Sequence, residues 1–200
     1  MNSEFSIRLA SEEDITGILE IYNPIVVSTP ISFEYEVPSD KTLKERFFKK
    51  YKHYPFIVGL QDNRLTGYAY ASPHRERTAY QWAVETSIYV HPKYKNKGFA
   101  TCLYTSLLKI LKVLGYFNAY AGIVTPNKAS EAFHQSMGFK HIGTYSGIGF
   151  KLDKWHNVNW WEYEIQRKIT NPDTPKSIVT FSDIQKINYI LSNSLKMLKT

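Results

Sequence analysis

The amino-acid sequence predicts an α/β (α+β) domain built on a mixed, mostly antiparallel, twisted sheet with helices on both faces. Two observations lead to this fold class. An early hairpin pattern requires antiparallel pairing of neighbouring strands, whereas a later strand-helix-strand unit requires a parallel crossover. At 200 residues the chain is long enough for one domain with a full hydrophobic core.

The first half of the chain begins with an alternating segment and then changes to helical spacing. Ser11 with Asp14 three residues later is a capping-box pattern for a helix continuing through Tyr22, and Pro24 is expected to lie in the loop that follows. The expected elements here are a strand at 5–10, a helix from 11, a second helix over 41–54 capped by Ser39 or Asp40, and a hairpin of strands at 55–60 and 66–71.

The second half of the chain alternates long apolar strands with two helices. Gly98 opens the first of these helices, and Gly115 ends it as a C-terminal cap. The expected elements are a strand at 79–90, a helix at 98–114, a strand at 116–124, a helix at 127–137, and strands at 139–152 and 158–165. The resulting order is β-α-α-β-β-β-α-β-α-β-β, with a central β-α-β crossover.

The last part of the chain separates from this pattern. We expect a domain over 1–167 and a proline-punctuated linker with an amphipathic helix over 168–200. One apolar stripe of that helix comprises Ile184, Ile187, Leu191, Leu195 and Leu198. Such a stripe requires a partner, and we consider its own domain first, a second subunit next and a membrane surface last.

Composition excludes some classes of protein. The formal net charge is +7, but six basic residues lie within 41–52 at helical spacing, where a solvated helix face is favoured over a nucleic-acid patch. No apolar run approaches a membrane span and the N-terminus lacks a leader pattern, so we expect a cytoplasmic protein that contacts neither nucleic acid nor membrane. The single cysteine, Cys102, fits a reducing compartment and excludes a cysteine-built zinc site, and no metal site is expected.

A glycine turn joins the strand at 79–90 to the helix that follows. The first free backbone N–H groups of this helix, together with the helix dipole, form a site for an anion, and Gly98 and Ala100 allow a phosphate to approach closely. The turn lacks the GK[ST] of a P-loop and the G-x-G-x-x-G spacing of a dinucleotide fold. It is therefore a candidate phosphate site of another kind.

This turn, Lys95-Asn96-Lys97-Gly98-Phe99-Ala100, resembles the pyrophosphate-binding segment of the GNAT superfamily of N-acetyltransferases, with the pattern [RQ]-x-x-G-x-[GA]. Lysine stands at the first position, where that family prefers arginine or glutamine. Four further stretches, at 21–26, 29–40, 69–92 and 147–164, are similar to segments of the phosphinothricin N-acetyltransferase family. The resemblance extends over residues 5–165, and the tail lies outside it.

The resemblance implies an enzyme that moves an acetyl group from acetyl-CoA directly to the α-amino group of a small amino acid or analogue, such as phosphinothricin, methionine sulfone or methionine sulfoximine. It also implies a homodimer. The residues expected to bind the cofactor are Ile88, Tyr89, Val90, Lys95, Asn96, Lys97, Gly98, Phe99, Ala100, Thr101, Asn127 and Ser130.

Acetyl transfer to an amine requires a base that removes a proton from the ammonium, and the departing thiolate benefits from an acid. Glu85 lies in an apolar strand, where alternation puts it on the same side as Ser87 and Tyr89, and aromatic surroundings raise the pKa of a carboxyl group. We expect Glu85 to be the base, in agreement with the resemblance; the alternative is a salt-bridged strand residue.

His134 is the candidate acid. With Asn127 and Ser130 it forms one polar stripe on a helix, and it occupies the position where many GNAT enzymes place a tyrosine that protonates the thiolate. Imidazole performs such chemistry near neutral pH, although a single helical histidine is often structural.

Substrate contacts are expected from residues before the central strand and from two aromatic stretches. Arg75, Arg77 and Tyr80 align with family positions that hold the anionic groups of the substrate, and a guanidinium fork suits a carboxylate or phosphinate. By resemblance Phe33 would form a wall of the same pocket, with His156 as a further candidate.

Three alternatives remain at this point. The acceptor could be a protein N-terminus, a polyamine or an aminoglycoside, although the HRER stretch (74–77) disfavours a cationic acceptor. Cys102, in the first turn of the phosphate-facing helix where a thiolate is favoured, could carry the acetyl group, but nothing nearby in sequence serves as its base. A basic nucleic-acid-binding module would explain the charge, but it leaves Glu85 without a role.

Overall fold

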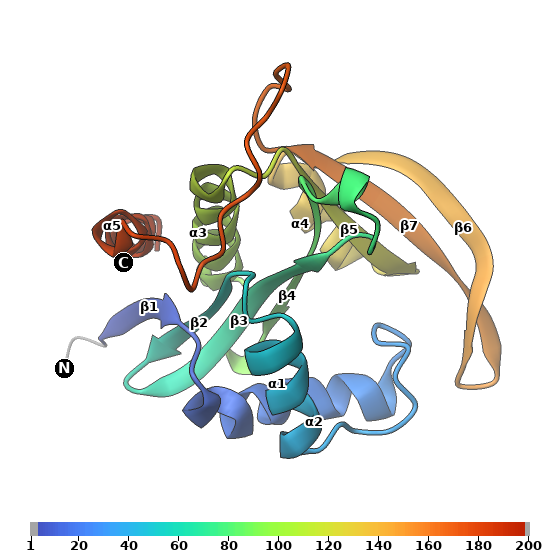
Figure 1. The fold of residues 1–200 in the computed structure, drawn as a ribbon. Helices are drawn as coiled ribbons and strands as arrows, with labels where there is room; N and C mark the ends of the chain where they lie inside the picture. Colours follow the sequence, from blue (N-terminus) through green and yellow to red (C-terminus); the bar gives the residue numbers. More distant parts are fainter. Residues whose placement is uncertain (1–3, 199–200) are drawn as a thin grey trace.

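The computed structural model describes residues 4–198, and the strands found there form one seven-stranded sheet (Figure 1). The strand order is β1-β2-β3-β4-β5-β7-β6, in which β4 and β5 pair in parallel and every other neighbouring pair is antiparallel. The strands are β1 Phe5–Leu9, β2 Phe56–Gln61, β3 Arg64–Pro73, β4 Ala83–Val90, β5 Asn118–Thr125, β6 Lys140–Lys151 and β7 Lys154–Glu164. The predicted mixed sheet with one central crossover is confirmed.

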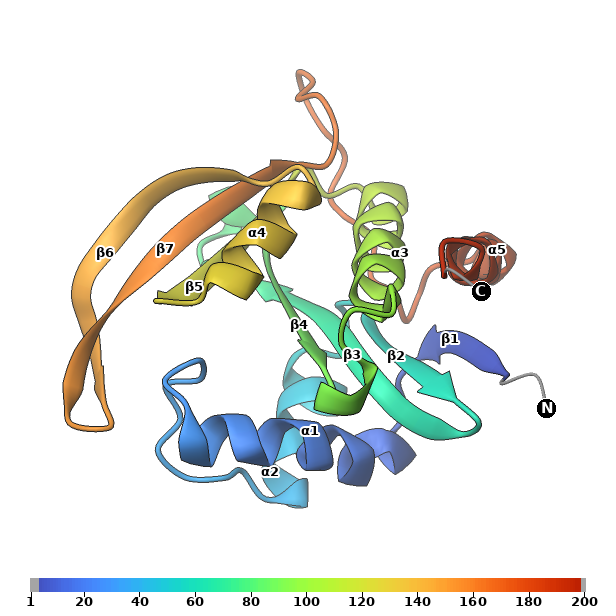
Figure 2. The same ribbon diagram turned by 180° about the vertical axis from the view of Figure 1, so that it is seen from behind.

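Helices cover both faces of the sheet. The α-helices are α1 Ile15–Ser28, α2 Asp40–Lys44, α3 Phe99–Leu114, α4 Lys128–Ser136 and α5 Ile184–Leu195, and α2 continues into a π-helical segment, η2 Glu45–Lys50. Short 3-10 turns lie at η1 Glu12–Asp14, η3 Thr78–Tyr80 and η4 Pro92–Tyr94. Figures 1 and 2 show α1 and α2 on one side of the sheet and α3 and α4 on the other, in the predicted order of elements.

Pro24 lies inside α1 and not in the loop where the sequence analysis placed it. A proline within a helix costs about 3 kcal/mol because one hydrogen bond is lost and its ring crowds the preceding turn. The helix nevertheless continues to Ser28 because residues on both sides of Pro24, Tyr22 and Val26, are buried. Burying such side chains contributes about 1.5–3 kcal/mol each, which offsets the cost of the proline.

Alternation along the strands divides the core into two clusters. Ile57 of β2 faces α3, whereas the next residue, Val58, faces α1 and η2. On the α3 side the cluster includes Leu103, Leu107 and Leu111, which are fully buried. Helices α1, α3 and α5 therefore cover β1 to β4, whereas β5 and β6 are contacted by α4.

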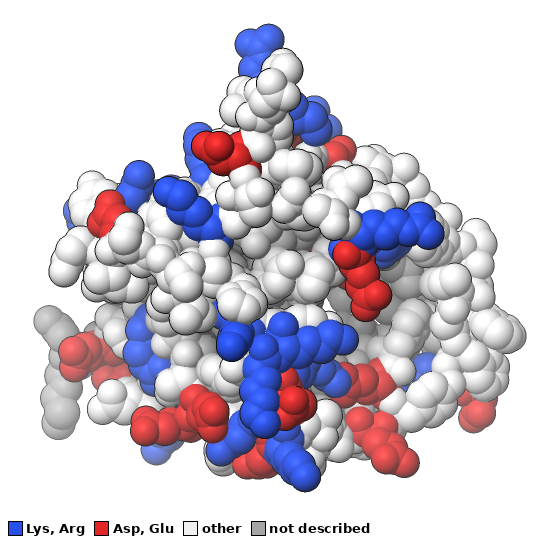
Figure 3. All heavy atoms as spheres, in the orientation of Figure 1, with Lys and Arg blue, Asp and Glu red and all other residues white. Residues whose placement is uncertain are grey.

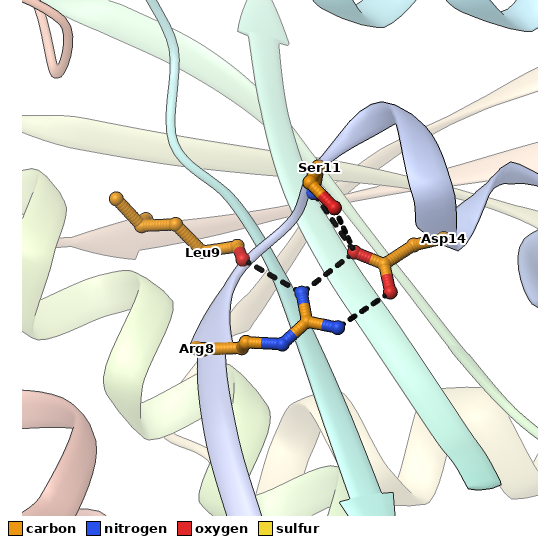
Figure 4. A network of polar contacts seen from close by, with 4 residues as sticks. All are labelled: Arg8, Leu9, Ser11 and Asp14. Carbon is orange, nitrogen blue, oxygen red and sulfur yellow. Dashed lines mark hydrogen bonds and ion pairs between the residues drawn. The ribbon is translucent and has the colours of Figure 1, made fainter. Parts of the chain in front are cut away.

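The junction between β1 and α1 is fixed by a polar network (Figure 4). The backbone N–H of Ser11 donates to Asp14 Oδ2 at 2.8 Å, which is the reverse half of the predicted capping box. Arg8 donates through both terminal nitrogens to the two oxygens of Asp14, each at 2.7 Å. Burial alone would raise the pKa of Asp14, but these hydrogen bonds outweigh it and hold the pKa below its ordinary value.

The tail packs along its own domain, the first of the three partners considered. Before α5 the chain is held by hydrogen bonds from Lys176 N to Leu114 O (2.7 Å) and from Trp82 Nε1 to Asp173 O (2.8 Å). Helix α5 then packs against α3 and β1, where Ile187 is fully buried. The predicted stripe is only partly covered, since Ile184 at its start is exposed.

Candidate active site

The sheet opens where β4 and β5 separate. The two strands pair only from Ala83↔Asn118 to Glu85↔Tyr120, and beyond that point each continues without the other. A small cavity lies in this gap. It is lined by Ile31, Thr86, Ser87, Ile88, Tyr89, Ala121, Gly122, Ile123, Val124, Asn127, Ser130 and His134. Five residues expected to take part in the chemistry or to bind the cofactor therefore meet here: Ile88, Tyr89, Asn127, Ser130 and His134.

Glu85 is the last residue of β4 that pairs with β5. Its carboxylate lies on the predicted side of the strand and is 34% exposed. Oε1 lies 3.1 Å from Nδ1 of His74 and 3.5 Å from Nη1 of Arg75. Burial raises the pKa of Glu85 above its ordinary value although the interactions with His74 and Arg75 lower it, and a raised pKa is the expected direction for a base.

His74 is a residue of this cluster that the sequence analysis missed. It directly follows β3, and Ser72 two residues earlier pairs with Glu85 across the two strands. This register brings the imidazole to the carboxylate. The sequence contains the histidine next to Arg75, but the cross-strand register that joins His74 to Glu85 is a tertiary property.

His134 is buried, with 4% exposure, and both ring nitrogens have partners. Nδ1 lies 2.8 Å from the carbonyl oxygen of Ser130, and Nε2 lies 3.1 Å from the hydroxyl of Tyr104, which in turn contacts Thr86. Burial lowers the pKa of His134. We assign a neutral ring whose Nδ1–H donates to Ser130 and whose Nε2 accepts from Tyr104, so the lone pair of Nε2 is occupied.

The glycine turn has the backbone shape that an anion site requires. Gly98 has φ +87°, in the left-handed region, and the N–H of Cys102 is the first in α3 to donate to its carbonyl. The preceding N–H groups have no acceptor in the helix itself, so they remain available for a phosphate. The Phe99 side chain is buried between Phe5 and Tyr94, so Phe99 offers a ligand only its backbone.

The structure also places Lys97, Asn127 and Cys102, which the sequence analysis associated with the cofactor site or with acetyl transfer. Lys97 places Nζ over the Tyr94 ring at 5.4 Å, beside the turn. The side chain of Asn127 accepts from Ser130 N and thereby caps α4. Cys102 is fully buried, and burial raises the pKa of its thiol to about 11, so the expectation that a thiolate is favoured there was wrong.

The expected substrate residues divide into two groups. Phe33 lies in the loop between α1 and α2, which reaches toward the β6–β7 hairpin (Figure 2), and its ring centroid is 6.4 Å from that of His156. Tyr80 is 44% exposed, and its ring lies 6.1 Å from that of His74. Arg77 is exposed at the start of η3 and, within residues 4–198, makes no ion pair, whereas Arg75 contacts Glu85.

The Phe33 loop is held in place by a buried lysine. Lys151 at the end of β6 is 3% exposed and donates from Nζ to the carbonyl oxygens of Val26 and Ser32, both at 2.6 Å. His156 Nε2 lies 2.9 Å from the carbonyl oxygen of Lys151. The loop and the hairpin therefore form one connected wall.

In the described part of the chain, no group of three or more histidine, cysteine or acidic residues could hold a metal ion. Over the same residues, no helix is long and apolar enough to cross a membrane.

Comparison with known proteins agrees with this geometry. The acetyltransferase (GNAT) domain family matches residues 7–160. A phosphinothricin N-acetyltransferase of Streptomyces coelicolor is 34% identical, over 80% of this chain and 96% of the relative. An L-methionine sulfoximine/L-methionine sulfone acetyltransferase of Salmonella typhimurium is 29% identical, over 80% of this chain and 94% of its own length.

Solved structures give the same result. A GNAT superfamily phosphinothricin acetyltransferase from Sinorhizobium meliloti, in complex with acetyl-CoA, superposes with a TM-score of 0.80 at 30% identity. The match covers 90% of this chain and 98% of that one. The family, the opened sheet and the glycine turn agree, and the chain belongs to the GNAT acetyltransferases, enzymes that use acetyl-CoA to acetylate amines.

Proposed function

We propose that this protein acetylates the α-amino group of a small amino acid or amino-acid analogue by direct transfer from acetyl-CoA. The observation that carries the proposal is the position of Glu85, a half-buried carboxylate at the point where β4 and β5 separate, next to an arginine. A base and a cation at one opening suit a substrate with an amine and an anionic group.

The residues that surround the gap fit acetyl-CoA. Ile88, Tyr89 and Val90 extend beyond the last β4–β5 pair, so their backbone groups on the β5 side are free to bind an extended ligand. The turn at 95–101 would hold the pyrophosphate through backbone N–H groups at the start of α3. Acetyl-CoA supplies an activated acetyl thioester at this position.

Glu85 performs the proton transfer in this proposal. Its carboxylate accepts a proton from the substrate ammonium, which leaves a neutral amine with a free electron pair. A carboxyl group with a raised pKa accepts the proton more readily than an ordinary glutamate does.

In this proposal His134 holds neighbouring groups in place and is not assigned the role of general acid. A neutral imidazole whose Nδ1–H donates to Ser130 has no proton on Nε2 to give to a leaving thiolate. The contacts support a role in holding α4 and Tyr104 against Thr86 at the cavity. Donation by His134 remains a prediction, and it would require a change in these hydrogen bonds.

The substrate class rests on the charges at the opening and on the relatives. Arg75 and Arg77 favour an anionic group, whereas a polyamine or aminoglycoside prefers an acidic pocket. The relatives named for phosphinothricin and for methionine sulfoximine and sulfone support acceptors of that type. Phe33, Tyr80 and His156 would form the rest of the pocket.

The nucleic-acid alternative is weakened by the surface around α2 and η2. Figure 3 shows acidic side chains among the basic ones on this side of the molecule. Arg46 pairs with Glu34 at 2.5 Å, and Lys49 pairs with Glu45 at 2.8 Å. Paired lysines and arginines release fewer counterions on binding a phosphate backbone, so they contribute less to affinity for nucleic acid.

A homodimer is also part of the proposal. Strand β6 is an edge strand, and large apolar side chains on β6 and β7 are exposed: Ile142, Tyr145, Ile148, Phe150 and Trp155. Trp155 is 68% exposed. Such a patch on an edge favours association with a second copy. The proposed compartment is the cytoplasm, which the single cysteine supports.

An amine panel tests the substrate class. Thiol release from acetyl-CoA is measured with phosphinothricin, methionine sulfone and methionine sulfoximine, and with spermidine, kanamycin and a peptide N-terminus. We expect the highest kcat/KM with an amino-acid analogue, and a preference for spermidine would refute the proposal. Glu85→Gln should reduce kcat by about 100-fold or more. Glu164→Gln, at an exposed position of β7, is the matched control.

A further inference from the structure

His74 makes an unusual set of contacts for a loop histidine. Its ring stacks on Tyr120 with centroids 4.6 Å apart and an interplanar angle of 24°. The ring also packs edge-on against Trp160 and Tyr80, with ring centroids 6.0 Å and 6.1 Å away. With its side chain only 16% exposed, His74 is held on several sides and has little freedom to rotate.

The surface beneath His74 is itself fixed. The hydroxyl of Tyr120 donates to Glu162 Oε1 at 3.1 Å, and Asn118 Nδ2 donates to the same oxygen at 2.6 Å. Tyr120 and Glu162 pair directly across β5 and β7. The position of the imidazole is therefore determined by three strands, β4, β5 and β7, as well as by its own loop.

The remaining contact joins this fixed ring to Glu85. Nδ1 of His74 lies 3.1 Å from Oε1 of Glu85, and Arg75 reaches the same oxygen at 3.5 Å. Both contacts therefore use Oε1, and within residues 4–198 no hydrogen bond involves Oε2. One carboxylate oxygen is anchored and the other is left for a ligand.

We propose that His74 is a positioning residue for Glu85, whose Nδ1–H donates to Oε1, fixes the carboxylate and directs Oε2 toward the substrate amine. This inference rests on the proposed role of Glu85 as the base. A rigid imidazole suits this task because a carboxylate on a strand otherwise has several side-chain rotamers. Arg75 is a poorer anchor, since it is 46% exposed and its contact is longer.

The electrostatics agree with this geometry. Burial raises the pKa of Glu85, and the interactions with His74 and Arg75 oppose the rise. The other ionisable groups that pack near this cluster include Tyr80, Tyr120 and Glu162. The pKa of Tyr120 is raised to about 12, so this residue is neutral, and Glu162 is engaged with Tyr120 and Asn118. Loss of the donor on His74 should therefore move the pKa of Glu85 further upward.

A purely structural role for the ring predicts a different result, and two substitutions separate the roles. His74→Phe keeps an aromatic ring on Tyr120 but removes the Nδ1 donor. His74→Asn removes the ring but keeps an amide N–H at the place of Nδ1. If His74 only packs, Phe is the milder change; if it positions Glu85, Asn is the milder change.

The experiment follows the Glu85 carboxyl by carbon-13 NMR titration of the free protein, with Glu85→Gln used to assign its resonance. This readout requires no knowledge of the acceptor. We expect the Glu85 pKa to rise in His74→Phe and to return toward the original value in His74→Asn. An unchanged pKa in His74→Phe, or an equal shift in both variants, would overturn the inference.

Kinetics with acetyl-CoA and methionine sulfone or phosphinothricin supply the second measurement. His74→Phe should lower kcat about tenfold and shift the acidic limb of the pH profile upward, with little change in KM for acetyl-CoA. In the Glu85→Gln background the same substitution should have no further effect. If Glu85→Gln alone keeps full turnover, the proposed function of Glu85 fails. If it is inactive and His74→Phe behaves as the original protein, only the inference about His74 fails.

Discussion

Gly149→Ala tests whether the Phe33 loop forms part of the substrate pocket. Gly149 lies on β6 directly under the Phe33 ring. A Cβ atom built at this position would lie 2.8 Å from Cδ2 of Phe33 and closer still to Cε2 and Cζ. The substitution adds one methyl group against an expected substrate contact and leaves Glu85 and the glycine turn unchanged.

The size of the effect follows from these distances. Ordinary van der Waals contact begins at 3.4 Å, so the ring must move by about 1 Å to admit the methyl group. Phe33 is only half-buried, so it can swing outward without forcing the backbone. We therefore expect a stability cost at the low end of the 1–3 kcal/mol that is typical of overpacking. We also expect a loss of about tenfold in kcat/KM for the acceptor, because a displaced wall weakens substrate binding.

The assay compares Gly149→Ala with Gly143→Ala on the same strand. A Cβ at Gly143 meets nothing within 4 Å, so this variant controls for the replacement of a strand glycine. Steady-state kinetics give KM for the acceptor and for acetyl-CoA, and thermal unfolding reports stability. KM for the acceptor should rise only in Gly149→Ala, while KM for acetyl-CoA stays constant in both. Equal acceptor kinetics in the two variants would refute the assignment of Phe33 to the pocket.

Three further predictions concern the cofactor turn, the tail and the N-terminal network. Gly98→Asp should weaken acetyl-CoA binding by about 100-fold or more in calorimetry, because it strains a left-handed residue and adds a negative charge at an anion site. Lys97→Ala should weaken binding by less than about threefold. The reverse order would show that the turn acts only through its basic side chains. Ile187→Ala should lower the free energy of unfolding in urea by about 2–5 kcal/mol, because Ile187 is fully buried. Tyr189→Ala, at a residue that is 67% exposed on the same helix, should change it by less than about 0.5 kcal/mol. Equal effects in the two variants would contradict the docking of α5. Because the pKa of Asp14 is lowered in the folded protein, its ionised form adds stability above the ordinary carboxyl pKa, and this contribution is lost as pH falls through the lowered value. Asp14→Asn should accordingly cost about 1 kcal/mol at neutral pH and little in strong acid, and a deficit that does not change with pH would exclude the ionic contribution.

The sequence alone determined the order of elements because each depends on local patterns. The Ser11–Asp14 cap, the helix start at Gly98 and the alternation around Glu85 are all properties of a few neighbouring residues, and the described structure contains each of them. The continuation of α1 through Pro24 could not be predicted in this way. It depends on burial against the sheet, which outweighs the local preference of proline.

Only the tertiary structure decided how the functional side chains meet. The sequence marked His134 as a candidate acid on a polar helix stripe, whereas only the packing of α4 against α3 shows that it is buried between Ser130 and Tyr104. The sequence also contained His74, but its contact with Glu85 requires the register of β3 against β4. Local periodicity specifies which elements form, whereas hydrogen-bond partners and pKa values depend on long-range packing that periodicity does not encode.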